Sequence, residues 1–510
     1  MLNLEREKYA IVDIGSNTMR LVIYLREKSG RLKEIENVKV VARLRNFLSD
    51  EGDLTEDGIR ILIDSLLSFR EVTNHHSLYD VKCVATATIR QAKNQQQILE
   101  RVNNDTEFSI QILSEYEEAY FGYLAVVNTT PFQCGITIDI GGGSTEVTYF
   151  HDRKLMNYHS FPFGALSLRK QFISGEIPTE SELITLRKFI KNQMDQLEWV
   201  KDKCLPIIGI GGSARNLVQI HQEYVAYPIA GVHQYLMSRE DVFEMNQYLQ
   251  SLSFPELQKV EGLSKDRADI IIPAVEVFRQ LMNIVGAEHF ALSRKGLRDG
   301  VFFEELTKEF GISVFPNVIE ESFYELATDY NVNLNHVFHV TNSAVMITEL
   351  LNKAGVISTT DEDKLFLKRG AFVYNLGSYI DSESSSQHTF YLLANRTIDG
   401  LFHKDRMIVA LIASYTSKSG FKRYVTPYSQ WFSREELQTY RILGAILKFA
   451  YSLNATKRNI IKSIDLHTYK EGLTFSITCH HDWKPEQYQA EKQKKHLEKL
   501  LKRSIAIIFS

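Results

Sequence analysis

Two glycine-rich segments of this chain place carboxylates beside backbone amides that no side chain shields. Residues 13–18 read Asp-Ile-Gly-Ser-Asn-Thr, and residues 139–146 read Asp-Ile-Gly-Gly-Gly-Ser-Thr-Glu. Unshielded N–H groups in such a loop can cradle phosphate oxygens, and an aspartate at a strand end can hold a hydrated divalent cation. Together the two segments predict a site for a phosphate group and a metal ion.

Each segment lies between two apolar, β-type runs, so each reads as a strand, a tight turn and a second strand. The two aspartates are 126 residues apart (139 minus 13), which is the size of one domain and indicates a duplicated half. Ordinary β-turns also use glycine, serine and asparagine, but the repeated Asp-Ile-Gly signature favours a functional site. A P-loop is excluded, because these turns lack its lysine and do not lead into a helix.

A third glycine segment is of a different kind. The apolar run Leu205–Ile210 predicts a strand that ends in Gly211, Gly212 and Ser213, and a helix is predicted from Ala214 to Ile220. The N-terminus of a helix attracts anions. This segment therefore predicts a further contact with phosphate.

Two adjacent glutamates follow a predicted strand at residues 110–113. Ser114 and Glu117 have the spacing of a capping box, which gives Glu117 a structural role at the start of a helix. Successive helical residues point about 100° apart, so Glu118 is directed away from the cap and can face a cleft. The alternative is a solvated glutamate on a helix surface.

The elements around these motifs indicate an α/β layer structure with a helical region after it. Between the hairpins, Thr55 can cap a helix through Ser68, and strands are predicted at 81–87 and 110–113. From about residue 310 helical periodicity takes over, for example at 337–351 and 440–453. The tail has strand-like runs at 473–479 and 505–509 around a lysine-rich helix.

Composition limits the class of protein. Of the 510 residues, 44% are hydrophobic and 24% are charged, so we expect about three folded domains and exclude disordered and fibrous classes. The net charge of -4 means that a polyanion must be bound by a local cationic cluster. Four scattered cysteines without a CxxC pair favour a reducing cytoplasm, and we expect neither export nor a membrane span.

Six motifs in a fixed order resemble one family. They look like the exopolyphosphatase and guanosine pentaphosphate phosphohydrolase family, and they are Asp13–Asn17, Ala85–Arg90, Glu117–Ala119, Asp139–Glu146, Gly209–Ser213 and Leu297–Gly300. The resemblance implies an α/β fold of duplicated actin-like (ribonuclease H-like) lobes, residues 1–130 and 131–308, with the active site in the interlobe cleft. An α-helical HD-like domain (309–460) and a small α+β C-terminal domain (461–510) would follow.

The resemblance also implies magnesium-dependent hydrolysis of a terminal phosphoryl group, with Glu118 as the base that activates water. Asp139 and Glu146 flank the second hairpin and are predicted to hold Mg²⁺, with Asp13 as the symmetric candidate and Mn²⁺ as an alternative ion. Because it would hold the metal ion, Glu146 is predicted to be catalytic together with Glu118. The predicted phosphate-binding residues are Ser16, Asn17, Thr18, Arg90, Gly141, Gly142, Gly143, Ser144, Gly211, Gly212 and Ser213.

Basic residues predict how a long anion would be held. Arg90 can clamp phosphate with its planar guanidinium, although a surface salt bridge is the alternative. A substrate channel is predicted along Arg267, Arg294, Lys295 and Arg298. The tail lysines are candidates to extend it, with a solvated face as the alternative; they are Lys492, Lys494, Lys495, Lys499 and Lys502.

The helical region departs from metal-dependent HD phosphohydrolases. His336 and His339 are present, but residues 374–377 read Tyr-Asn-Leu-Gly where a His-Asp pair is expected. Without those ligands we expect a scaffold rather than a metal site. His480 and His481 beside Cys479 fit no common metal motif and are predicted on opposite faces of a strand.

The leading functional hypothesis is an exopolyphosphatase that removes terminal phosphate from inorganic polyphosphate. Three alternatives stay open: hydrolysis of guanosine pentaphosphate (pppGpp), an actin-fold kinase that uses ATP, and a non-catalytic sensor of guanosine polyphosphates. A water-activating Glu118 argues against the sensor. The resemblance further implies a homodimer in the cytoplasm, and we expect no nucleic-acid partner.

Overall fold

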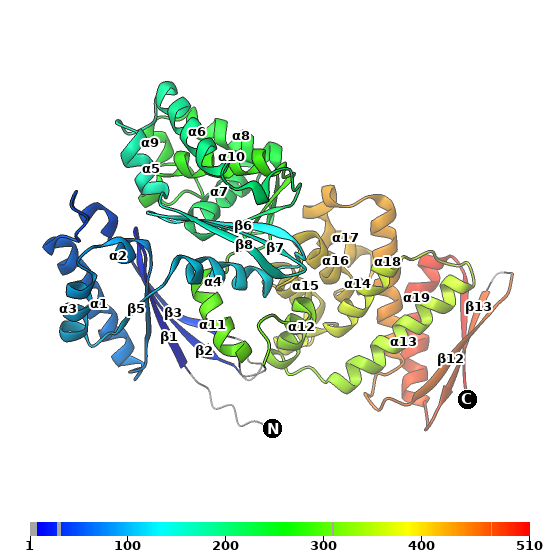
Figure 1. The fold of residues 1–510 in the computed structure, drawn as a ribbon. Coiled ribbons are helices and arrows are strands. Elements are labelled where there is room, and N and C mark those ends of the chain that lie inside the picture. Colours follow the sequence, from blue (N-terminus) through cyan, green and yellow to red (C-terminus); the bar gives the residue numbers. More distant parts are fainter. Residues whose placement is uncertain (1–7, 28–31, 309–310, 471) are drawn as a thin grey trace. The chain divides into compact units, whose positions relative to one another are not determined.

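The computed structural model describes residues 8–27, 32–308, 311–470 and 472–510. The chain forms two compact units, which divide between Val318 and Ile319 (Figure 1). The first unit contains two mixed sheets, and the second contains a helical region and a small sheet. None of the helices in these ranges is both long enough and apolar enough to cross a membrane.

The first sheet has five strands in the order β3-β2-β1-β4-β5. The antiparallel strands are β1 (Lys8–Ile14), β2 (Met19–Arg26) and β3 (Leu32–Val40), and the parallel strands beside β1 are β4 (Lys82–Ala85) and β5 (Ile110–Ile112). As the central strand, β1 is buried on both faces, which is why its apolar run is continuous.

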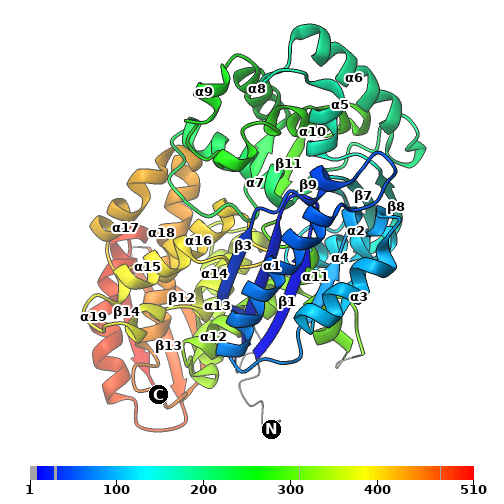
Figure 2. The same ribbon diagram turned by 90° about the vertical axis from the view of Figure 1, so that its left-hand side faces the viewer.

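Helices cover both faces of this sheet. One face packs on α1 (Glu56–His75) and α3 (Gln95–Thr106), seen in Figure 2, with η1 (Leu44–Phe47) and the short α2 (Ala87–Gln91) nearby. The other face packs on α4 (Glu115–Val127) and α11 (Leu297–Lys308) through Phe121, Val301 and Phe302. The last helix of the predicted second lobe therefore packs with the first sheet.

The second sheet repeats the plan with one extra strand. Its order is β10-β11-β9-β6-β7-β8, and β6, β7 and β8 form an antiparallel meander with β9 and β11 parallel to β6. The strands are β6 (Gly135–Ile140), β7 (Thr145–His151), β8 (Lys154–Phe161), β9 (Ile207–Ile210), β10 (Leu236–Ser238) and β11 (His289–Leu292). The predicted duplication is thus visible in the strand order.

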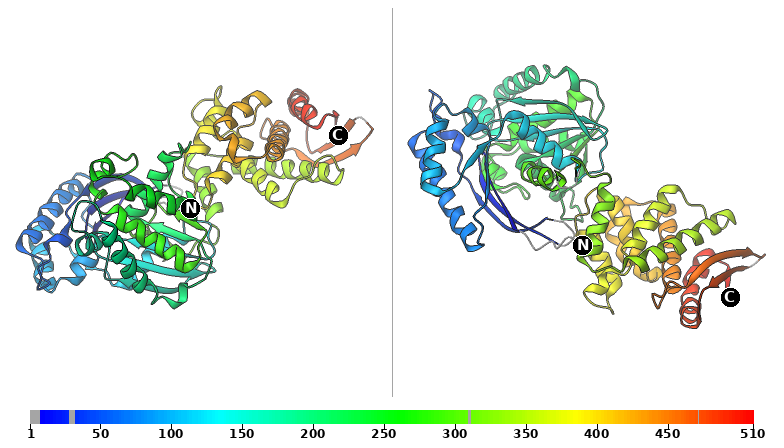
Figure 3. Two further views of the ribbon diagram at one scale, coloured as in Figure 1. Left: turned by 90° about the horizontal axis from the view of Figure 1, so that it is seen from above. Right: turned by 60° about the horizontal axis from the view of Figure 1, so that its bottom comes forward.

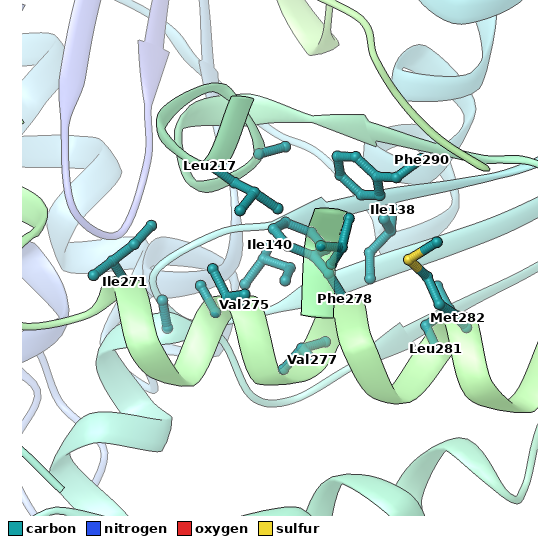
Figure 4. Packing of buried hydrophobic residues seen from close by; sticks show 14 of the residues in the cluster. Ile138, Ile140, Leu217, Ile271, Val275, Val277, Phe278, Leu281, Met282 and Phe290 are labelled. Carbon is teal, nitrogen blue, oxygen red and sulfur yellow. The ribbon is translucent and has the colours of Figure 1, made fainter. Parts of the chain in front are cut away.

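The core of this half lies between the sheet and α10 (Ile271–Val285). Val275, Phe278 and Met282 of α10 pack with Ile138 of β6 and Phe290 of β11 (Figure 4). The other helices are α5 (Ala165–Phe172), α6 (Glu180–Met194), η2 (Glu198–Val200), α7 (Gly211–Tyr224), α8 (Arg239–Gln250), α9 (Phe254–Leu257) and η3 (Lys265–Arg267).

The second unit is helical and ends in a three-stranded sheet, β12-β13-β14 (yellow-green to red in Figure 3). Its helices are α12 (Val318–Asp329), α13 (Leu334–Lys353), α14 (Asp361–Phe372), η4 (Leu376–Tyr379), α15 (Ser385–Asn395), α16 (His403–Ala413), α17 (Lys418–Val425), η5 (Thr426–Trp431), α18 (Arg434–Ser452) and α19 (Lys484–Leu501). Its strands are β12 (Ile461–Thr468), β13 (Gly472–Cys479) and β14 (Ser504–Phe509).

The structure corrects several predicted boundaries. The helix capped by Thr55 runs to His75 rather than Ser68, because Phe69 and Thr73 are also buried on its inner face. The strand predicted at 81–87 ends at Ala85, since α2 begins at Ala87. Strand β12 was not predicted; its exposed residues alternate with partly buried ones and give only a weak apolar signal.

Candidate active site between the two glycine hairpins

The tips of the two hairpins meet in the first unit and border a cavity of about 380 Å³. A Cβ atom on Gly142 would lie 3.1 Å from Ser16 Cβ, and one on Gly143 would lie 2.9 Å from Ser16 Oγ. Such close approach is possible because glycine has no side chain. The two motifs that are far apart in sequence therefore form one site, as predicted.

Most of the predicted site residues line this cavity. The predicted residues found there are Asp13, Ser16, Asn17, Thr18, Glu118, Asp139, Gly141, Gly142, Ser144, Glu146, Gly211, Gly212, Arg267, Arg294 and Arg298. They come from both hairpins, from the start of α4, from the start of α7, from η3 and from the segments around α11. The local motifs are brought together because the two sheets belong to one compact unit.

Four predicted site residues do not line the cavity. Gly143 faces Ser16 instead, and Ser213 is buried one residue further into α7. Lys295 Nζ donates to Asp299 Oδ1 at 3.0 Å, a pair typical of the i,i+4 spacing at the start of a helix. Arg90 is the fourth; it forms a salt bridge, but a largely buried one with Glu118 rather than the surface salt bridge that was its alternative.

Arg90 contacts the predicted base rather than the cavity. Its Nη1 donates to Glu118 Oε2 at 2.8 Å and to the Leu113 carbonyl at 2.9 Å. It does so because α2 ends beside the loop that leads into α4. The guanidinium therefore holds Glu118 in place from the protein side.

Glu118 lies at the start of α4, as the capping box predicts. Ser114 and Glu117 form that box, with the Glu117 carboxylate accepting from the Ser114 N–H at 2.8 Å. Burial is the main influence on Glu118 and raises its pKa to about 7, while the charge of Arg90 opposes the rise. A carboxylate with a pKa near neutrality can accept a proton from water at physiological pH.

Three more carboxylates line the cavity. Burial and then the charge of Asp13 raise the pKa of Asp139 to about 6, and burial together with Glu118 and Asp139 raises the pKa of Glu146 well above its usual value. Asp13 Oδ2 accepts from Arg298 Nη1 at 2.9 Å, and Glu146 Oε1 accepts from Ser160 at 2.9 Å. The carboxylates repel one another, so the site favours a cation among them.

Three basic lining residues were not predicted: Arg20, Lys39 and Arg215. Arg20 is the cross-strand partner of Asp13 in β2, the place that Glu146 occupies opposite Asp139 in β7. The duplication offers a signal that could have found it, because 20 plus 126 is 146. Arg215 and Lys39 carry no such signal.

The basic side chains crowd one another. Burial, followed by the charges of Arg20, Arg298, Arg294 and Arg267, lowers the pKa of Arg215 to about 10. Among the described lining residues, six are cationic (Arg20, Lys39, Arg215, Arg267, Arg294 and Arg298). Guanidinium groups that repel one another beside a cavity favour the binding of an anion with several charges.

The start of α7 explains why two glycines occur there. Gly211 has φ 81°, and a Cβ on it would lie 2.4 Å from Asp139 Oδ1. A Cβ on Gly212 would lie 2.2 Å from Arg267 Nη2. The helix begins at Gly211, three residues before the predicted start, so its N-terminal amides border the cavity.

His336 and His339 lie on α13 of the helical unit. His336 is buried, and its Nδ1 lies 2.9 Å from Asn454 Nδ2. Burial lowers the pKa of His336 to about 4, which keeps the ring neutral. In the described part of the unit, no three His, Cys, Asp or Glu side chains have ligand atoms within 4.8 Å of one another. That this unit acts as a scaffold stays a prediction.

Two family models match the chain. Residues 22–309 match the Ppx/GppA phosphatase family, and residues 318–499 match Ppx/GppA phosphatase, domain III. The first match alone covers more than half of the 510 residues. The division between the matches agrees with the division between the two compact units.

Named relatives are similar over the first unit. A bifunctional 3-dehydroquinate synthase/phosphatase of Fusobacterium nucleatum is 24% identical over 308 residues, which cover 58% of this chain and 46% of the relative. This match thus spans about half the length of that relative. Exopolyphosphatase 1 of Mycobacterium bovis is 23% identical over 308 residues, covering 59% of this chain and 89% of the relative.

Solved structures agree with the fold. The Ppx/GppA family member of Aquifex aeolicus has 28% sequence identity and a TM-score of 0.53, covering 60% of this chain and 99% of that chain. An exopolyphosphatase from Cytophaga hutchinsonii has 20% identity and a TM-score of 0.54, covering 59% and 98%. The predicted fold class, duplicated actin-like halves followed by a helical domain and a small α+β domain, is confirmed.

Proposed function

The chain belongs to the Ppx/GppA phosphatase family, and from this premise we propose that it is an exopolyphosphatase. In this proposal it hydrolyses the terminal phosphoanhydride bond of inorganic polyphosphate, and Glu118 activates the attacking water. The observation that carries the proposal is the lining of one cavity. It combines Glu118, whose pKa is about 7, with a cluster of arginines whose charges repel one another.

The cations support a substrate with many charges. Phosphoryl transfer leaves the protein mainly to position the reactants and to balance the charge of the non-bridging oxygens. Asn17 is buried at the first hairpin, and neither atom of its side-chain amide has a hydrogen-bond partner. In the proposal this amide and the backbone of Gly141 and Gly142 bind the terminal phosphate, and the arginines bind the phosphates behind it.

Glu118 supplies the base. Its carboxylate takes a proton from water as the water oxygen attacks phosphorus and the phosphoanhydride oxygen leaves. Arg90 donates to Oε2 of this carboxylate and fixes its orientation. In the proposal the other oxygen, Oε1, accepts the proton. Glu117 cannot substitute, because it is engaged in the helix cap.

The donor set fits Mg²⁺. The lining carboxylates provide hard oxygen ligands, and burial, followed by their mutual repulsion, raises the pKa of Asp139 and Glu146. Mg²⁺ usually keeps several waters and is bound through one or two carboxylates.

Asp139 and Glu146 would hold this ion, since Asp13 is already bound by Arg298. When bound, Mg²⁺ would lower the negative charge on the transferred phosphoryl group. Mn²⁺ has similar ligand preferences and would serve as a substitute. The homodimer, the cytoplasmic location and the extension of the substrate channel by the tail lysines stay predictions.

The test is phosphate release by the purified full chain with Mg²⁺ and, separately, long polyphosphate, pppGpp and ATP. We expect polyphosphate to be the best substrate. Glu118→Gln should lower turnover by about 10²- to 10⁴-fold with substrate binding retained. The matched control is Glu117→Gln, which should leave turnover and stability nearly unchanged, because a glutamine at this position can also complete the capping box with Ser114.

Each alternative has its own outcome. Preferred release from pppGpp would make the chain a pppGpp phosphohydrolase, and phosphate transfer from ATP to an acceptor would make it a kinase. Binding without release of phosphate would indicate a sensor. Near-normal turnover of Glu118→Gln would remove Glu118 from the mechanism.

A further inference from the structure

A cysteine, a histidine and an aspartate come together at the end of the β6–β7 hairpin opposite to the cavity. Cys134 directly precedes β6, His151 ends β7, and Asp152 begins the turn into β8. Asp139 follows Cys134 by five residue steps along the strand, a distance of about 17 Å at the usual rise. The group is therefore distinct from the phosphate site.

The ligand atoms of these three side chains lie close together. One ligand atom from each lies within 4.8 Å of the other two. Cys134 Sγ is 3.1 Å from His151 Nδ1, and His151 Nε2 is 3.8 Å from Asp152 Oδ2. Among the described residues no other group of three such side chains meets this condition.

The backbone fixes this arrangement. Gly135 pairs with Phe150 in the antiparallel ladder, so Cys134 and His151 continue it by one position. The turn consists of Asp152 and Arg153, with φ 47° and 57°, the pattern of a two-residue type I′ turn. Its second residue is tied to the segment before β6, because the Arg153 N–H donates to the Gln133 carbonyl at 2.9 Å.

The neighbouring cationic side chains, Arg153 and Lys203, contact other parts of the protein. The Arg153 guanidinium donates to the carbonyls of Val127 at 2.8 Å and Pro316 at 3.3 Å. The Lys203 ammonium lies over the ring of Tyr149 at 5.2 Å. The side chains of His151 and Asp152 are 53% and 78% exposed, so an ion from solvent can reach them.

We propose that Cys134, His151 and Asp152 form a binding site for a divalent transition metal of the zinc class. A thiolate, an imidazole and a carboxylate are the ligands that Zn²⁺ prefers, whereas Mg²⁺ prefers oxygen alone. Three protein ligands leave the fourth tetrahedral position to water or to another ligand. The site differs in metal preference from the carboxylates of the cavity.

Binding involves a proton. The metal displaces the thiol proton of Cys134, which passes to solvent, and it takes the place of the contact between Sγ and Nδ1. Affinity therefore falls as the pH is lowered. Since the ligands are held by strands and a tight turn, the metal binds a preformed site and the fold does not depend on it.

The experiment titrates the metal-free full chain with Co²⁺, which reports a thiolate ligand by a charge-transfer absorption band. We expect one equivalent of Co²⁺ to produce the band and Zn²⁺ to abolish it. Cys134→Ser and His151→Ala should lose it. Cys204→Ser removes another exposed cysteine and should keep it.

A second variant keeps the test decisive if Cys134→Ser folds poorly. Asp152→Asn retains a residue type that accepts a positive φ, so the turn is preserved while one ligand is weakened. We expect it to keep the band at a higher Co²⁺ concentration. No band in the wild type, or an unchanged band in Cys134→Ser, would overturn the site. Phosphate release with Mg²⁺ should be the same in Cys134→Ser and the wild type.

Discussion

The ion pair of Arg90 and Glu118 links the structure to a pH profile that can be measured. Burial raises the pKa of Glu118 to about 7, and the guanidinium 2.8 Å away opposes that rise. A general base acts only when it is ionised, so kcat/KM should rise with pH through about 7 and then level off. Removing the guanidinium should move this rise to higher pH.

The perturbation is Arg90→Met, which keeps an unbranched apolar stem and removes the charge. An opposite charge at this distance changes the pKa of a carboxyl group by about 1 to 3 pH units. The midpoint should therefore move from about 7 to between about 8 and 10. At pH 7, where the wild-type base is half ionised, the rate should fall by about 5- to 500-fold, while at high pH the two profiles should converge.

The assay is the initial rate of phosphate release from polyphosphate at low substrate, from about pH 5 to about pH 10 and at constant ionic strength. Arg101→Met is the matched control, because Arg101 pairs with the exposed Glu56 on α1. Its profile should match that of the wild type. Thermal melting of both variants checks the fold, since Arg90 also donates to the Leu113 carbonyl.

Two results would refute this reasoning. If the Arg90→Met profile superimposes on the wild-type profile, Arg90 does not set the pKa of the base. If the rate falls by the same factor at every pH, Arg90 acts on the substrate or on the position of Glu118. In Glu118→Gln the rise near pH 7 should be absent, and its presence would assign the base to another group.

Three further predictions concern metal, stability and backbone. Excess EDTA should abolish phosphate release, and Mg²⁺ or Mn²⁺ should restore it; full activity in EDTA would refute a metal requirement. The raised pKa of Glu118 means that the folded state loses stability, on the order of 3 kcal/mol, as the pH rises from about 4.5 through about 7. Glu118→Gln should therefore raise the Tm at pH 8 and have little effect at pH 4; equal effects at both values would contradict this. Gly211→Ala should cost about 1 to 3 kcal/mol by strain at φ 81° and should raise the Mg²⁺ requirement by displacing Asp139, as measured by melting and by Mg²⁺ titration. Gly355→Ala is the control, because Gly355 has φ 66° and open space around it. It should lose stability through backbone strain and leave the Mg²⁺ requirement unchanged.

Local motifs were predictable from the sequence because their contacts lie within a few residues. Both glycine hairpins form at the predicted places, and the box of Ser114 and Glu117 caps α4 as expected. That cap also fixed the direction of Glu118, which is one residue further round the helix. The sequence alone therefore indicated that both hairpins and Glu118 border one cavity, and the ordered motifs identified the family.

Only the tertiary structure decided which basic side chains reach the cavity. Arg90 turns to Glu118, and Lys295 pairs with Asp299, although both were expected on the substrate. Arg215 and Lys39 line the cavity without a sequence motif of their own. A long side chain has many rotamers, and its direction depends on partners that strand pairing brings close from distant positions.

The same reason explains the group at the other end of the β6–β7 hairpin. His480 and His481 follow Cys479, where β13 ends, so they do not lie on opposite faces of a strand as predicted. Cys134 meets His151, 17 residues away, because an antiparallel ladder places them across from each other. Sequence determines which side chains are available, and the register of the strands decides which of them meet.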